Sequence, residues 1–302
     1  MAAKVTPASR DGPDSVAAVR DLLLAHIDAV TRRLALRRAM TDVDVHEARK
    51  SIKRARAVLK LLRPSLAEND LARCKAALRD AGKVLAAARD AKVIVDRLDE
   101  MLRRAGIAKS AVSGLAHELS GVAASSTQPG DSAAALASLV LVRKRLARVP
   151  LPASHWTPLG AGVRSIYRSG RQLVPTKSDS VSVEAMHEWR KQVKSYWHAL
   201  EVFAPTHPTQ IRRTIGSARR LADTLGEDHD LALLADHVST AATENRAEPV
   251  AELLDAIEQR RRRLHRRAVK IGTALYAEAP AVMEKRLRRH WQQWRARRAL
   301  DD

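Results

Sequence analysis

Two segments of the chain place a histidine ahead of regularly spaced positive charges. The first, VHEARKSIKRARAVLKLLRP, covers residues 45–64, and the second, MHEWRKQVKSYWHALEVFAP, covers residues 186–205. Both contain the pattern H-E-x-R-K-x-x-K, in which arginine and lysine recur about one helical turn apart. Guanidinium and ammonium groups arranged in this way favour an extended anion. The two segments therefore predict a track for a polyanion.

Helical spacing separates a buried stripe from a basic stripe in the first segment. The buried stripe contains Val45, Ala48, Ile52, Ala55, Leu59 and Leu62. One residue further on, about 100° around the helix, the basic stripe contains His46, Arg49, Lys53, Arg56, Lys60 and Arg63, with Lys50 and Arg54 beside it. The basic stripe is therefore expected at the edge of the core.

The second segment repeats this geometry over its first two turns. Its buried stripe contains Met186, Trp189, Val193, Tyr196, Leu200 and Phe203. Its basic stripe contains His187, Arg190 and Lys194, with Lys191 beside it. Candidate N-caps lie at 41–44 and at Ser182, so both histidines are expected near helix N-termini, where free amides and the helix dipole favour anions.

Other interpretations of these residues remain open. A basic helix face can simply be solvated, and each histidine could be a hydrogen-bonded core residue. Keeping the histidine and the charges in both copies favours binding. No metal site is predicted, because none of the eleven histidines belongs to an H-x-x-x-H or H-E-x-x-H pair. Cys74 is the only cysteine, which excludes an internal disulfide.

The similarity extends beyond the two segments and predicts an internal duplication. Offsets of 141 and then 140 residues relate His46 to His187, Pro64 to Pro205, Arg79 to Arg219, and Asp90 to Asp230. A sequence match that keeps its register through a turn is a better sign of duplication than a short match. We expect Asp90 and Asp230 to cap the helices that follow them. The triplet Glu227, Asp228 and Asp230 is an alternative Mg²⁺ site, although only one copy contains it.

Composition predicts an all-α protein with a polyanionic partner. The 302 residues include only 12 Gly and 12 Pro, and 54 Lys and Arg against 34 Asp and Glu give a net charge of +20. Helices are predicted at 15–39, 43–62, 65–87, 90–105, 108–125, 132–148, 156–173, 182–203, 208–225, 228–243, 247–277 and 280–299. We predict a disordered tail at 1–14 and two pseudo-symmetric antiparallel bundles at 15–150 and 151–302 that face each other.

Further basic residues fit this interpretation less sharply. Arg79 and Arg219 lie on the next helix of each half, with Lys83 one turn after Arg79, and Arg168 shares a helix face with two other arginines. The dense runs at 260–267 and 284–298 are expected to form a solvated outer face. The longest apolar run is too short for a bilayer, and residues 1–16 contain no secretory pattern. We therefore expect a soluble cytoplasmic protein without membrane insertion.

The duplicated H-E-x-R-K-x-x-K helix, followed by LAAARD in one half and TLGEDHD in the other, resembles the CHAD family, the conserved histidine α-helical domain. The resemblance implies two helical bundles around a basic channel that binds inorganic polyphosphate, without a cofactor, and an association with polyphosphate granules. It covers residues from about 15 to the end. Ala86 and Lys92 depart from the family pattern at the turn of the first half.

The resemblance also implies which residues bind the polyphosphate. The motif positions are His46, Arg49, Lys50, Lys53, His187, Arg190, Lys191 and Lys194, with Arg54 in the first copy alone. Weaker matches are Arg79, Lys83, Arg168 and Arg219. No catalytic residue is assigned. Two other functions stay open, a basic helical protein that binds nucleic acid or other polyanions, and an enzyme that processes phosphoanhydrides.

Overall fold

The structure, a computed structural model, describes residues 13–36, 38, 40–85, 90–108, 132–152, 156–176, 181–240 and 247–301. Every regular element in these ranges is helical, which confirms the all-α prediction. The helices of the first half are α1 (Val16–Leu34), α2 (Asp42–Leu61), α3 (Glu68–Val84), α4 (Asp90–Ala105) and α6 (Ser132–Arg148). Those of the second half are α7 (Thr157–Gln172), α8 (Val183–Phe203), α9 (Pro208–Thr240), α10 (Ala247–Leu275) and α11 (Pro280–Asp301).

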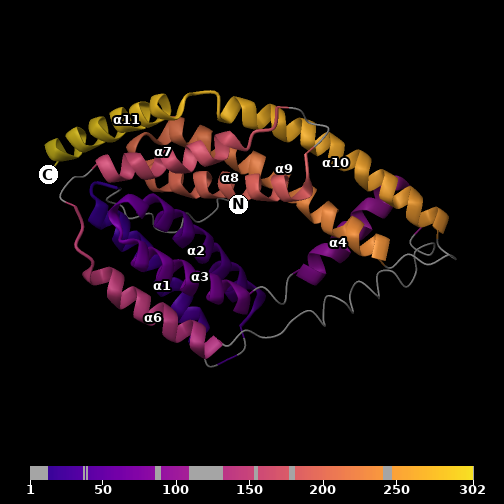
Figure 1. Cartoon of the computed structure of the whole chain (residues 1–302), viewed down its shortest axis with the longest axis horizontal. Helices are drawn as coiled ribbons and strands as arrows, with labels where there is room; N and C mark the ends of the chain where they lie inside the picture. Colours follow the sequence, from indigo (N-terminus) through magenta and orange to yellow (C-terminus); the bar gives the residue numbers. More distant parts are fainter. Residues whose placement is uncertain are drawn as a thin grey trace.

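The helices form two groups that meet along α2 and α8. In the first group, α1 packs on α2 and α6, and α3 packs on α2 and α6. In the second, α8 packs on α7 and α9, α9 packs on α10, and α11 packs on α7. Figure 1 shows α2 and α8 at the junction, with α6 and α11 at opposite margins of the molecule. The two motif helices thus hold the two groups together.

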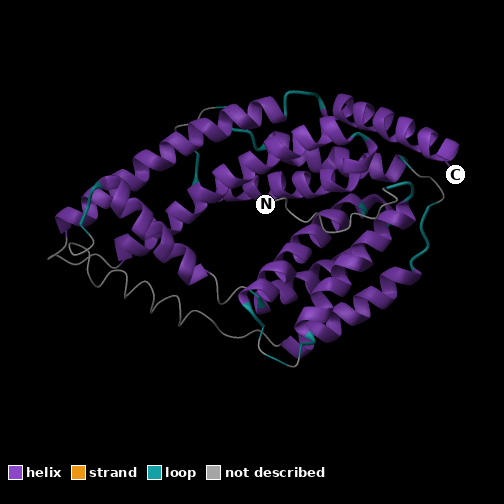
Figure 2. Ribbon diagram, turned by 180° about the vertical axis from the view of Figure 1, so that it is seen from behind, coloured by secondary structure: helices purple, strands orange, loops and turns teal. Residues whose placement is uncertain are grey.

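One hydrophobic core runs through both groups, from Val16 to Trp294. The buried stripe of α2, with Ile52 and Ala55, belongs to this core together with Trp189 and Val193 of α8. A second, smaller core forms where α4 packs on α9 and α10. Because α4 comes from the first half of the chain and α9 from the second, the halves are joined at two places. Figure 2, the view from behind, shows α4 beside the end of α9 and the start of α10.

The two motif helices begin and end in the same way. The Thr41 hydroxyl accepts a hydrogen bond from the Asp44 amide, and the Ser182 hydroxyl accepts one from the Ala185 amide. Each helix is followed at once by a 3₁₀ turn that contains a proline, η1 (Arg63–Ser65) and η3 (Ala204–Thr206). Each histidine is therefore the fifth residue after its hydroxyl cap.

Two contacts between α2 and α8 are reciprocal. Arg54 Nε pairs with Glu201 Oε2 at 3.0 Å, and Lys60 Nζ donates to Ser195 Oγ at 2.8 Å. Ser195 lies 141 positions after Arg54, and Glu201 lies 141 positions after Lys60. If each residue is replaced by its equivalent in the other half, the pair of positions in one contact becomes the pair in the other. The two helices therefore run antiparallel and contact each other through positions that the sequence pattern matches.

The structure differs from the predicted helices at one clear place. We expected two helices at 208–225 and 228–243, but α9 is a single helix from Pro208 to Thr240. Gly226 lies within it, and a Cβ there would approach Arg190 Nη2 to 3.2 Å. The glycine therefore gives room to a side chain of α8 and does not end the helix. The predicted helix at 108–125 and residues 1–12 of the predicted tail lie outside the described residues.

The expected capping role of Asp230 is wrong for the same reason. This residue lies inside α9, so its side chain is not needed for a helix N-terminus. The side chain of Asp90 is outside the described part. Among the described helices, none combines the length and the apolar character that crossing a membrane requires.

Gly162 of α7 lies against the main chain of α2, and it provides a test of this packing. A Cβ at Gly162 would collide with the Leu61 carbonyl, which is main chain and cannot rotate away. We expect Gly162→Ala to lower the free energy of unfolding by about 2–3 kcal/mol, measured by urea denaturation.

Gly216 in α9 is the matched control. A Cβ there would make an ordinary contact with Arg220 Nη1 at 3.6 Å. Gly216→Ala should therefore raise the free energy of unfolding by about 0.5–1 kcal/mol, as alanine does in a helix interior. Equal effects of the two substitutions would contradict the packing described here.

Candidate anion-binding site

Positive charges from α2 and α8 converge where the two helices meet. Burial, followed by the charges of Arg190 and Lys53, lowers the pKa of Lys194 to about 7. Asp230 and Asp223 oppose this shift without cancelling it. Lys53 comes from α2 and the other two cations come from α8, so the junction concentrates like charge from both halves.

A second part of the junction surrounds Lys60. This ammonium donates to Gln192 Oε1 at 3.2 Å and to Ser195 Oγ at 2.8 Å. Burial lowers its pKa, Glu188 opposes the shift, and the charges of Lys75, Lys191 and Arg56 add to it. Lys60 was part of the predicted basic stripe but not of the predicted ligand set. Lys60 lies two helical turns after Lys53, and this spacing could have added it to the predicted ligands.

Two arginines of the motif attach their helices to the next helix in the chain. Arg49 Nη1 donates to the Leu85 carbonyl at the end of α3, at 2.8 Å. Arg190 lies against Gly226 of α9. The Arg49 guanidinium is thus held on the main chain after α3, and that of Arg190 lies against α9, where its charge acts on Lys194. The predicted ligands Arg49 and Arg190 hold the site together as well as adding charge to it.

The two motif histidines have different surroundings. His46 is exposed, whereas His187 is half-buried, with its ring centroid 4.3 Å from that of His229 in α9. Burial, followed by Lys191 and Arg190, lowers the pKa of His187. Burial, followed by His187 and Arg190, lowers that of His229 to about 4. Because α2 and α8 are antiparallel and each histidine is near a helix start, they lie toward opposite ends of the helix pair.

Sequence analysis missed His229 as a site residue. It lies in LGEDHD, which we interpreted only as a turn with an acidic cluster. The Nδ1 atoms of His187 and His229 are buried, and neither has a hydrogen-bond partner among the described residues. The position equivalent to His229 in the first half is Arg89, which lies outside the described residues.

Three other predicted ligands form ion pairs. Arg54 pairs with Glu201, which also contacts His198 Nδ1 at 3.0 Å. Lys50 pairs with Glu47, and Lys191 pairs with Glu188, both at 3.2 Å. The Arg54 pair joins α2 to α8, whereas the two lysine pairs are local contacts within a helix.

The four weaker matches lie at the margin of the junction or away from it. Arg79 is exposed beside Asp80, and Lys83 is exposed on the same helix. Arg219 is 3.8 Å from Asp223, which is itself close to Lys194, and it lies over the Trp197 ring. Arg168 is exposed on α7, which lies between α8 and α11 (Figure 1). None of these four is a main contributor to the pKa shift of Lys194 or Lys60.

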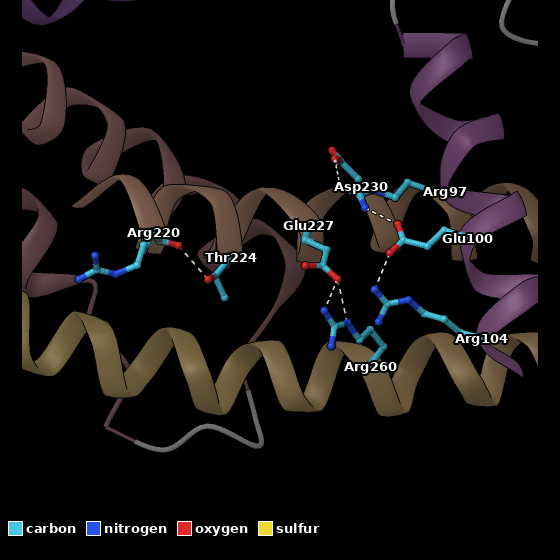
Figure 3. Close-up of polar contacts among 8 residues, drawn as sticks. All are labelled: Arg97, Glu100, Arg104, Arg220, Thr224, Glu227, Asp230 and Arg260. Carbon is cyan, nitrogen blue, oxygen red and sulfur yellow. Dashed lines mark hydrogen bonds and ion pairs between the residues drawn. The ribbon is translucent and has the colours of Figure 1, made fainter. Parts of the chain in front are cut away.

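The acidic triplet of α9 binds arginines. Glu227 pairs with Arg260 of α10 at 2.6 Å, and Asp228 is bound by Arg261 at 3.1 Å and by His265. Asp230 is 3.6 Å from Arg97 of α4. Figure 3 shows how Glu227 and Asp230 point to opposite partners from one helix. Carboxylates paired in this way fix α10 and α4 on α9.

A chain of ion pairs extends this clamp along α4. Glu100 lies between Arg97 and Arg104 and is 2.6 Å from each (Figure 3). Within the described part of the chain, no group of three or more His, Cys, Asp or Glu side chains is arranged to hold a metal ion.

Comparison with protein families agrees with this geometry. The model of the CHAD domain matches residues 21–239. The chain belongs to the CHAD domain family. The match contains both motif helices and the whole of their junction, and it ends within α9, so α10 and α11 lie beyond it. A search of curated proteins finds no match.

The low pKa of Lys194 predicts a stability effect with a definite sign. Lysine is protonated in the unfolded chain up to its model value of 10.5, but in the folded protein only up to about 7. The penalty is therefore complete below pH 7 and disappears as the pH rises to 10.5. Lys194→Met should raise the free energy of unfolding by on the order of 3 kcal/mol at pH 6, with little gain at pH 10.

Lys191 is the control, because it is an exposed lysine on the same helix. Lys191→Met should change the free energy of unfolding by less than about 0.5 kcal/mol at either pH. A Lys194→Met gain that does not depend on pH would show that Lys194 is not forced toward neutrality.

Proposed function

We propose that the junction of α2 and α8 binds inorganic polyphosphate. The observation that supports this most strongly is the meeting of Lys53 with Lys194 and Arg190, where like charges and burial lower the pKa of Lys194 to about 7. A protein gains nothing in stability from such an arrangement on its own. An anion that occupies the junction would turn mutual repulsion into attraction.

A linear phosphate polymer matches the spacing of these cations. Lysine and arginine one turn apart on a helix are about 5–6 Å from each other, which adjacent phosphates can span. Each ammonium or guanidinium group that binds a phosphate releases counterions, so binding should weaken steeply with salt. Guanidinium groups fixed by main-chain contacts, such as Arg49 on Leu85 O, need little ordering when the ligand arrives.

We also propose that the site has two equivalent halves produced by duplication. Lys53 and Lys194 are equivalent in the repeat, 141 positions apart, and each lies close to the other across the junction. His46 and His187 lie toward opposite ends of the helix pair. A polyphosphate chain that follows the junction would thus meet an imidazole near each end and lysines in the middle.

Binding without hydrolysis is the activity that we propose. The acidic residues that could have held Mg²⁺ for phosphoryl transfer are bound by Arg260, Arg261 and Arg97. Incubation of the pure protein with polyphosphate and Mg²⁺ should release no phosphate. Cytoplasmic localisation and association with polyphosphate granules are part of the same proposal, and labelled protein should colocalise with granules in cells.

Charge removal at the junction tests the proposed site. Lys53→Gln with Lys194→Gln should weaken the binding of a defined polyphosphate by about tenfold or more at 100 mM salt. It should also reduce the slope of log affinity against log salt by about 2, because two phosphate contacts disappear. Fluorescence anisotropy at several salt concentrations measures both quantities.

The matched control is Lys144→Gln with Arg148→Gln on α6. Both residues are exposed, and the change of charge is the same. Their variant should keep the affinity within about twofold and the slope within about half a unit. Equal weakening by the two variants would mean that polyphosphate responds only to net charge, which would overturn the proposed site.

The pH dependence of binding tests the role of the depressed pKa values. A bound phosphate favours the protonated forms of His187, His229 and Lys194, whose pKa values are low in the free protein. Affinity should therefore rise as the pH falls from about 8 to 6, and binding should take up protons. Calorimetry in two buffers with different ionisation enthalpies counts those protons.

Variants separate the histidines from the lysine. His46→Ala with His187→Ala should flatten the pH profile in part, and adding Lys194→Gln should remove most of what remains. An unchanged profile in the histidine variant would remove imidazole from the binding mechanism.

A further inference from the structure

The densest concentration of positive charge in the chain lies outside the segment that matches the CHAD family. Residues 260–299 contain 14 Lys and Arg and only two Glu, which gives this short stretch a net charge of +12. The family match ends at residue 239. The junction of α2 and α8 lies within the matched segment and therefore does not account for this local surplus.

The structure places this charge on an outer surface. Both α10 and α11 lie along one edge of the molecule in Figures 1 and 2. One side of each helix closes a core, with Leu264 and Ala268 of α10 and Leu287 and Trp291 of α11 buried. The exposed basic residues, called here the outer basic face, are Arg262, Arg263, Arg266, Arg267, Lys270, Lys285, Arg288, Arg289, Arg295 and Arg297.

Few acidic groups compensate this face. Arg262 pairs with Glu258 at 3.1 Å. Among the described residues, none forms an ion pair or hydrogen bond with Arg263, Arg266, Arg267 or Lys270. A solvated face of a soluble protein normally mixes both signs of charge. An uncompensated row of arginines across neighbouring helices indicates a polyanionic partner.

We propose that the outer basic face binds double-stranded DNA through its phosphodiester backbone, independently of base sequence. This site is separate from the junction of α2 and α8, and the proposal does not depend on polyphosphate binding there. The protein would then be able to hold a phosphate polymer at its centre and duplex DNA at its edge at the same time.

The aromatic residues of α11 favour backbone contacts over recognition of single strands. Single-strand binding depends on exposed aromatic rings that stack with bases. Here Trp291 and Trp294 are buried, and Arg295 and Arg298 lie over their rings at 4.9 and 5.4 Å. The face therefore presents guanidinium groups to the solvent where a stacking platform would need open rings.

The shape of the face favours a stiff duplex of B form. A flexible polyphosphate would lose conformational freedom on the exposed sides of two helices, whereas duplex DNA presents its phosphates in a fixed array with a persistence length of about 50 nm. The basic stretch of each helix extends roughly 15–20 Å, about half a turn of DNA.

An anionic membrane fits this face less well. Helices that lie on membranes insert an apolar side, but the apolar sides of α10 and α11 are used in the two cores. Val282 and Leu300 are the large apolar residues that α11 exposes, and within the described residues α10 exposes none.

The test compares two variants that lose the same charge. The outer variant combines Arg263→Gln, Arg266→Gln, Arg267→Gln and Lys270→Gln. The control combines Arg32→Gln, Arg73→Gln, Lys144→Gln and Arg148→Gln, which are exposed positions on α1, α3 and α6. Binding of a fluorescent duplex of about 20 base pairs, in two unrelated sequences, is followed by anisotropy over a range of salt.

We expect the outer variant to lose at least about tenfold in affinity at 100 mM salt for both sequences, and its salt slope to fall by about 3–4. The control should stay within about threefold of wild type. Circular dichroism and urea denaturation check that both variants are folded. Equal losses in the two variants, or unchanged binding by the outer variant, would overturn the proposal.

Competition distinguishes this face from the central site. Saturating short polyphosphate should leave the duplex bound, and Lys53→Gln with Lys194→Gln should leave DNA affinity unchanged. Displacement of DNA by stoichiometric polyphosphate would assign both ligands to one site and overturn the proposal. Tighter binding of single strands, duplex RNA or phosphatidylserine vesicles at matched charge would also overturn it.

Discussion

The packing of α2 on α8 forces like charges together. Ile52 and Ala55 of α2 and Val193 of α8 are buried in one core, and the basic stripes lie directly beside these apolar residues. Hydrophobic burial holds the helices in contact, and the charges of Arg190 and exposed Lys53 then act on half-buried Lys194. Burial of the apolar residues therefore offsets the repulsion between the cations, which are in position before any ligand arrives.

This arrangement couples the stability of the folded protein to the binding of an anion. Ligand that binds only the folded protein stabilises it by mass action, and here it would also relieve the repulsion that lowers the pKa of Lys194. The two halves are not identical, because an Arg54–Glu201 ion pair on one side corresponds to a Lys60–Ser195 hydrogen bond on the other. The first half thus adds more positive charge to the junction than the second.

Local signals in the sequence predicted most of the helices, and tertiary contacts explain the features that the prediction missed. Thr41, Ser182, Pro64 and Pro205 marked helix ends correctly, because caps and breakers act within a few residues. The predicted break between residues 225 and 228 was wrong, because α9 continues through Gly226, where the missing side chain admits Arg190 from α8.

The same division applies to the site. Helical periodicity placed Lys53, Arg190 and Lys194 correctly on basic stripes, and the structure brings these three together. The contact of His187 with His229 and the pairing of Arg54 with a residue 147 positions away depend on how the helices pack. The packing of α4 on α9 has a topological consequence, because a chain cut near residue 150 would leave α4 on one fragment and the surface that it covers on the other.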